Sequence, residues 1–224
     1  MKRLHVTFVA ACLCLAIGTA ASAQMGMNFF KKPAIADIFK PVVGSGSVYE
    51  TEQNQRKSTM EMSVVGQEPV DGKDAYWLEF GHTDQSNGTT VYGKMLVTKD
   101  DFQFHRMIVQ RPGQPPLEFP MNMMSNAQSR TSAELDKWHK VGVETIIVPA
   151  GTFLCDHWAK DDGKGDVWAS AKVSPMSLVK ETTPTNSMTL IKVITDAKDH
   201  ITGTPTKFDP EAMKRQMMQQ QNPQ

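Results

Sequence analysis

The sequence predicts a mainly β protein, built as a curved antiparallel sheet or half-open β barrel with two or three short helices. Two observations lead to this fold class. From Gly46 onward, apolar and polar residues alternate with a period of two, which is the spacing of half-buried strands. Short Asn-Gly, Asp-Gly and Asp-rich corners separate these runs, and such corners accept the positive φ that tight hairpins need. The pattern is therefore that of one continuous meander.

The first predicted element is an export signal at residues 1–23. Two basic residues start an uncharged apolar stretch, and Ala21-Ser22-Ala23 supplies a small-residue cleavage site. The apolar stretch contains polar interruptions and is too weak for a membrane span. We therefore expect a periplasmic or secreted protein with no transmembrane segment after cleavage. The residues that end at Cys12 also fit a lipoprotein signal, so lipidation of this cysteine remains an alternative.

Residues 24–43 are predicted to form a linker followed by one short helix. Pro33 suits a first helical position, and Ile35, Ile38 and Phe39 would share one face of that helix.

Residues 44–208 are predicted to form the antiparallel domain. Met60, Met62 and Val64 alternate with polar neighbours as a half-buried strand does. The expected strands are 47–53, 57–65, 75–82, 90–97, 102–110, 117–121, 143–148, 153–160, 166–170, 178–183 and 187–194. The expected hairpin corners are Asp71-Gly72, Asn87-Gly88, Lys99-Asp100-Asp101 and Asp161-Asp162-Gly163.

Two further segments are predicted outside this strand pattern. A capping-box sequence at residues 131–134 favours a short helix with Leu135, Trp138 and His139 on one face. Residues 209–224 are polar and predict a C-terminal tail that is partly helical or disordered.

Charge and cysteine content exclude some classes of function. The chain holds 24 basic and 24 acidic residues, and its lysines and arginines are scattered, which argues against a nucleic-acid partner. After signal cleavage Cys155 is the one remaining cysteine, so no internal disulfide can form. Cys155 and His157 lie two residues apart on a predicted strand, but such residues are about 6–7 Å apart, too far for direct activation of a thiol. We expect a structural cysteine and no enzyme activity.

Methionine is the unusual component, with 15 in the chain. Three uses are open: ordinary core filling, an adaptable apolar pocket, and soft ligands for Cu(I). Met60 and Met62 on one strand face favour the core or the pocket. The predicted pocket-lining residues are Met60, Met62, Leu78, Phe80, Met95, Met121 and Met124.

Several short motifs resemble a known family of exported bacterial domains. In the C-terminal half these are Glu144-Thr145, Val148-Pro149-Ala150-Gly151-Thr152-Phe153, His157-Trp158 and Val167-Trp168. In the N-terminal half they are Gly72-Lys73, Trp77-Leu78-Glu79 and Gly113-Gln114-Pro115-Pro116. Together they resemble the outer-membrane lipoprotein-sorting carriers, the LolA/LolB-like superfamily, over residues 44–208. The resemblance implies a half-open β barrel whose concave face, capped by short helices, shelters an acyl chain.

The sequence therefore predicts an exported binding protein that shelters a hydrophobic ligand, a lipid or acyl chain, in a Met-rich concave sheet face. No cofactor and no metal site are expected in this interpretation. Two alternatives stay open: a Cu(I)-binding module that uses the methionine clusters, and an envelope interaction protein that has no ligand.

Overall fold

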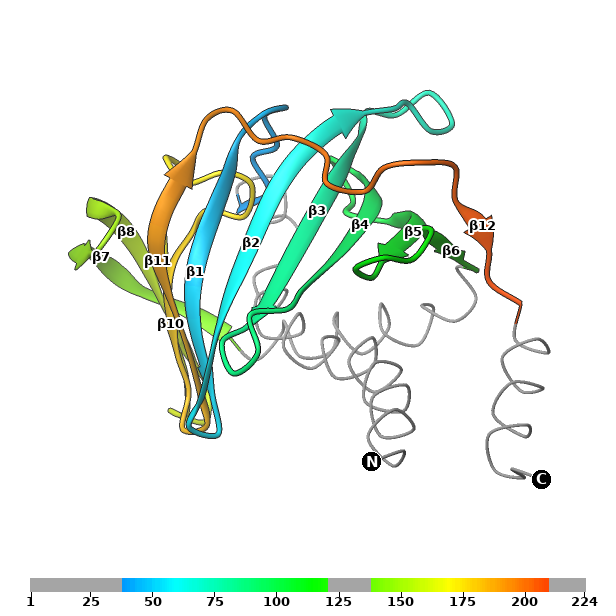
Figure 1. Cartoon of the computed structure of the whole chain (residues 1–224). Helices are drawn as coiled ribbons and strands as arrows, with labels where there is room; N and C mark the ends of the chain where they lie inside the picture. The colour runs from blue at the N-terminus through cyan, green and yellow to red at the C-terminus, as the bar shows by residue number, and fades with distance from the viewer. Residues whose placement is uncertain (1–37, 121–137, 210–224) are drawn as a thin grey trace.

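The computed structural model describes residues 38–120 and 138–209. Its strands are β1 (Gly46–Gln53), β2 (Arg56–Gln67), β3 (Ala75–Asp84), β4 (Thr90–Thr98), β5 (Phe104–Gln110), β6 (Leu117–Phe119), β7 (Trp138–Val148), β8 (Gly151–Lys160), β9 (Asp166–Ala169), β10 (Leu178–Thr182), β11 (Asn186–Ile194) and β12 (Thr206–Lys207). All of them join one open, curved sheet in the order β12-β6-β5-β4-β3-β2-β1-β11-β10-β9-β8-β7 (Figure 1). Within the two described ranges, no helix is long and apolar enough to cross a membrane.

The central feature of this topology is the position of β1. It pairs antiparallel with β2 on one side and with β11 on the other, so Tyr49 lies opposite both Met60 and Leu190. The first and last long strands of the sheet are therefore neighbours, and the two halves of the meander extend outward from them. Only β12 pairs in parallel, with β6.

The predicted mainly β, antiparallel architecture is confirmed, and every predicted strand is present. The two-residue strand β12 was not predicted. The expected two or three helices are not found in residues 38–120 and 138–209, where only Ile38 has helical backbone. The predicted export signal and most of the residues assigned to helices lie outside these ranges.

One helix prediction is wrong where it can be tested. Trp138 and His139 were expected on a helix but begin strand β7, where Trp138 pairs with Lys160. The Trp138 ring packs closely on Gly165, the residue before β9. A Cβ added at Gly165 would lie only 2.9 Å from the indole Cη2. Pairing and packing across the sheet therefore override the local capping pattern.

The hairpin corners explain why the strands turn where they do. Asp71 and Gly72 have φ values of 50° and 76°, as expected for an Asp-Gly corner. The β1–β2 hairpin turns at Asn54 and Gln55, whose φ values are 49° and 66°. This second corner holds two left-handed residues without a glycine, and sequence reasoning missed it for that reason.

Replacing Gln55 by glycine should therefore stabilise the protein. A non-glycine residue in the left-handed region costs about 1 kcal/mol, and Asn-Gly is the preferred pair for a two-residue turn of this hand. We expect Gln55→Gly to raise the free energy of unfolding by about 0.5–1 kcal/mol in urea titrations. A decrease on substitution would show that the Gln55 side chain contributes more than its backbone strain costs.

The segment that joins β11 to β12 crosses the outer, convex face of the sheet (Figure 1). Its His200 bonds through Nδ1 to Glu79 Oε1 at 2.7 Å, and Lys94 Nζ donates to Asp199 Oδ2 at 2.5 Å. The Ile201 side chain of the same segment is buried. These contacts hold the segment against β3 and β4 and cover the outer face there.

Candidate functional site

The candidate site is the inner face of the sheet, defined as the face that carries Tyr49, Met62 and Leu78. Strand register brings the predicted pocket residues together on it, because directly paired residues point to the same side. Met62 lies opposite Phe80, and Leu78 lies opposite Met95. Met60 lies opposite Tyr49. Five of the seven predicted residues thus share this face, whereas Met121 and Met124 lie outside the described residues.

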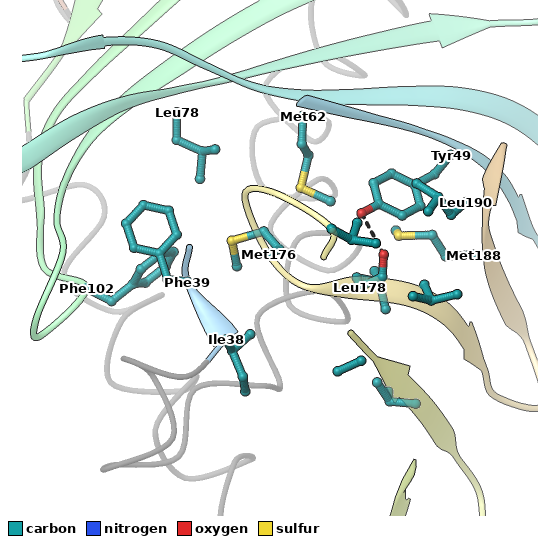
Figure 2. Close-up of a cluster of buried hydrophobic side chains, with 14 of the residues drawn as sticks. Ile38, Phe39, Tyr49, Met62, Leu78, Phe102, Met176, Leu178, Met188 and Leu190 are labelled. Atoms are coloured by element: carbon teal, nitrogen blue, oxygen red, sulfur yellow. Dashed lines mark hydrogen bonds between the residues drawn. The ribbon is translucent and has the colours of Figure 1, made fainter. Parts of the chain in front are cut away.

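One end of the inner face, which we call the closed end, is filled by the chain itself (Figure 2). Phe39 is fully buried and packs edge-to-face on Phe102, with ring centroids 5.0 Å apart, and on Tyr76 at 6.5 Å. Phe102 in turn packs on Phe104 at 5.4 Å. This aromatic cluster covers the strand ends of β3, β4 and β5.

The loop between β9 and β10, residues 170–177, also covers the closed end. Its Met176 is buried among the core side chains (Figure 2). Ser177 Oγ donates to the Ile38 carbonyl at 2.7 Å, and the Lys40 amide donates to the Pro175 carbonyl at 2.8 Å. The loop and residues 38–40 therefore form one plug that packs on the inner face from two distant parts of the sequence.

The other end of the inner face, which we call the open end, is less covered. Along β2, Val64 is 0% exposed and Met62 is 3% exposed, whereas Met60 is only half-buried. Along β3, Leu78 is 0% exposed, whereas Phe80 is half-buried. The same gradient runs along two neighbouring strands, from Val97 through Met95 to Val91 on β4 and from Phe104 to Met107 and Val109 on β5.

Apolar side chains thus continue toward solvent on four adjacent strands. The sequence pattern explains the lining, because β2 to β5 place an apolar residue at alternate positions over most of their length. The half-buried members at the open end have surface still available for contact. Met60, Phe80 and Met107 are half-buried and pack against the core cluster.

The inner face also carries a buried acid that the sequence predictions missed. Glu181 on β10 lies opposite Met188 and Val167, both core residues, and its side chain is completely buried. Neither carboxyl oxygen has a hydrogen-bond partner in the described part of the chain. Burial raises the pKa of Glu181 to about 8, so the carboxyl group is protonated at neutral pH.

A second polar atom near this acid lacks a partner. Trp138 is almost fully buried, and within residues 38–120 and 138–209 its indole Nε1 donates to no acceptor. A Cβ added at Gly165 would lie 2.9 Å from the Trp138 ring and 3.6 Å from the carbonyl oxygen of Thr182, the last residue of the strand that carries Glu181. Buried polar groups without partners are costly and uncommon. A carboxyl group and an N–H donor therefore remain available for hydrogen bonding in an otherwise apolar region.

The thiol and imidazole predicted to be structural do not form a reactive pair. Cys155 is buried in the core, and burial together with nearby Glu144 and Asp156 raises the pKa of its thiol to about 11. His157 instead bonds to Glu144 Oε1 through Nδ1 and to Asp166 Oδ1 through Nε2, both at 2.8 Å. The thiol is therefore protonated at neutral pH and is a poor nucleophile.

The copper alternative involves methionines both inside and outside the described residues. Met60 and Met62 share one face of β2, but the methionines at 25, 27, 121, 123 and 124 lie outside the described residues. Among residues 38–120 and 138–209, no group of three His, Cys, Asp or Glu side chains could hold a metal ion. Cu(I) binding through thioethers stays a prediction.

Comparison with known proteins gives distant structural likenesses. No family model matches the chain, and no curated protein matches it. One similar solved structure is a predicted lipoprotein from Parabacteroides distasonis, with 15% identity and a TM-score of 0.37 over 70% of this chain and 98% of that one. Another is a predicted exported protein with a YmcC-like fold from Bacteroides fragilis, with 10% identity, a TM-score of 0.39 and the same coverage.

A third similar structure is MucB in complex with MucA(peri), with 13% identity and a TM-score of 0.41. The match covers 82% of this chain and 59% of MucB. At this distance the likenesses do not assign a function, and the resemblance to lipoprotein-sorting carriers stays a prediction.

Proposed function

We propose that this is an exported binding protein that holds a hydrophobic ligand, a lipid or acyl chain, against the open end of the inner face. One observation carries the proposal: along β2 to β5, the apolar lining changes from fully buried at the closed end to half-buried at Met60, Phe80 and Met107. A core that served stability alone would have no reason to continue apolar residues toward solvent on four adjacent strands.

The side chains at the open end suit a ligand of variable shape. Methionine has three rotatable bonds and a polarisable sulfur, so Met60 and Met107 can adjust to different chains. Phe80 adds a flat apolar surface directly opposite Met62. The plug at the closed end would block access to the inner face from that side. The ligand would therefore enter from the open end.

We assign the polar part of the proposed site to the unpartnered carboxyl of Glu181 and indole N–H of Trp138, which lie buried on β10 and β7, on the other side of β1 and β11 from the lining of β2 to β5. At neutral pH both groups can donate a hydrogen bond, because the raised pKa of Glu181 keeps its carboxyl protonated. A ligand with an oxygen acceptor at its polar end would satisfy them. Binding rather than catalysis is proposed, since the described acid and thiol groups lack an activating partner.

Titration with a fluorescent fatty acid tests this function. Replacing Phe80 by glutamine should weaken binding about tenfold or more, because it removes roughly 1.4 kcal/mol or more of apolar contact. Phe80 is only half-buried, so the substitution should leave the sheet folded, which circular dichroism checks. Met60→Gln is expected to act in the same direction.

Leu154→Gln is the matched control, since this residue is apolar and 67% exposed but lies on β8, which β1, β11, β10 and β9 separate from the lining of β2 to β5. Its affinity for the fluorescent fatty acid should equal that of the parent protein. Equal loss in Phe80→Gln and Leu154→Gln would indicate nonspecific adsorption and contradict the proposed site. Full affinity in both would place the ligand elsewhere.

A further inference from the structure

The two edges of the sheet differ in a way that ligand binding does not explain. At one edge, β12 has only two residues, which is a common protection of a sheet edge against unwanted pairing. At the other edge, β7 has eleven residues, and among the described strands it pairs with β8 alone. A long unprotected edge strand is a template for another strand.

The register of the β7–β8 hairpin shows which backbone groups of β7 face away from the sheet. Val148 and Gly151 flank its two-residue connection and are paired. Such a connection closes on a hydrogen-bonded pair, and hydrogen-bonded pairs recur at every second residue. In the regular part of the strand, the residues that point their N–H and C=O groups outward are Val143, Thr145 and Ile147. None of the three donates or accepts a backbone hydrogen bond to another described segment.

The side chains of this edge are suited to contact with protein rather than water. Val143 is 57% exposed and Ile147 is 81% exposed, and both lie on the same side as Leu154. Between Val141 and Leu154 the only ionisable residue is Glu144. Its carboxylate is already occupied, because it accepts from Trp168 Nε1 at 2.6 Å and bonds to His157. His139 and Lys140 place the other ionisable groups of β7 at its first residues, so the stretch from Val141 to Val148 carries little of the exposed charge that normally repels a second strand.

We propose that β7 pairs antiparallel with β7 of a second copy of this chain, with Thr145 on the two-fold axis. The register follows from the strand itself. The β7–β8 ladder is regular from Gly142 to Val148 and shifts only before Gly142, so three outward-facing residues are evenly spaced. A two-fold axis that uses all three must pass through the middle one. Thr145 then faces its own copy, and Val143 faces Ile147 of the partner.

This pairing fits a second copy better than an unrelated peptide because the edge is complementary to itself. The two-fold places the exposed apolar residues of one copy directly beside those of the other, and cross-strand pairs of β-branched residues stabilise a sheet. All outward backbone groups of Val143, Thr145 and Ile147 find partners. The result is a continuous sheet across two subunits, with both open ends left free for ligand.

Cysteine cross-linking of the exported full-length protein tests the register. In a hydrogen-bonded antiparallel pair the Cα atoms are about 5.5 Å apart, a separation that a disulfide spans. Thr145→Cys should therefore become mostly covalent dimer under mild oxidation. The parent protein is the negative control and should form no covalent dimer. Its Cys155 thiol is buried, and burial raises the pKa of this thiol to about 11.

Two matched variants control for chance collisions. Val143→Cys alone and Ile147→Cys alone should remain unlinked, whereas a mixture of the two should give a cross-linked heterodimer. Thr145→Pro removes one outward N–H without touching the β8 ladder, and should shift the sedimentation equilibrium from dimer to monomer. Self-linking of Val143→Cys as efficient as that of Thr145→Cys, or a parent protein that is monomeric at high micromolar concentration, would overturn the proposal.

Discussion

Replacing Glu181 by glutamine is expected to stabilise the protein by as much as about 5 kcal/mol at pH 9 and to change its stability little at pH 4. The folded protein holds the pKa of this acid at about 8, against an ordinary value of 4.5, because its side chain is buried without a partner. Below pH 4.5 the carboxyl is protonated in both states and costs nothing extra. As the pH rises from 4.5 to 8, only the unfolded chain loses the proton, so the wild-type protein loses stability.

Urea titrations of both proteins across pH 4 to 9 measure this difference directly. Glutamine keeps the shape and neutrality of the protonated acid, so other titrating groups cancel in the comparison. The gap between the two curves should open through the range from 4.5 to 8 and stay constant above it. A gap that is already present at pH 4, or that never opens, would mean that Glu181 is not held as a buried neutral acid.

Replacing Phe39 by alanine is expected to cost about 3–5 kcal/mol of folding free energy. The ring is fully buried, packs edge-to-face on Phe102 and Tyr76, and forms part of the plug at the closed end. Its removal leaves a cavity between residues 38–40 and the sheet. The midpoint of urea unfolding, followed by tryptophan fluorescence, measures the loss.

Val42→Ala is the matched control for this substitution, since Val42 lies three residues further along but is 60% exposed. Its effect should stay within about 0.5 kcal/mol. Similar losses in Phe39→Ala and Val42→Ala would show that the whole segment contributes through its backbone, and that the aromatic cluster does not hold the plug in place.

The fold was largely predictable because most of its signals are local. Period-two alternation located the strands, and Asp71-Gly72 marked a corner whose residues do have positive φ. The Asn54-Gln55 corner carries no glycine, and β12 has only two residues, so neither gave a signal. The pairing of β1 with β11 depends on residues more than 130 positions apart, which local patterns do not encode.

The site was predictable only in part, for a related reason. Met62, Leu78 and Met95 fall on one face by strand alternation alone, and the register confirms that they lie together. Glu181 was missed because no motif singles it out within the predicted strand 178–183. Its position two residues after the apolar Val179 was a usable signal, since both must share a face. That no partner reaches the carboxyl could be learned only from the structure.

The central claim is that the open end of the inner face holds a lipid or acyl chain, and native mass spectrometry tests it most directly. The protein would be purified from its own cell envelope without denaturation, beside Phe80→Gln prepared in the same way. We predict a species heavier than the bare chain by the mass of one lipid, much reduced in Phe80→Gln. A parent protein that carries only its own mass and takes up no fluorescent fatty acid would contradict the account.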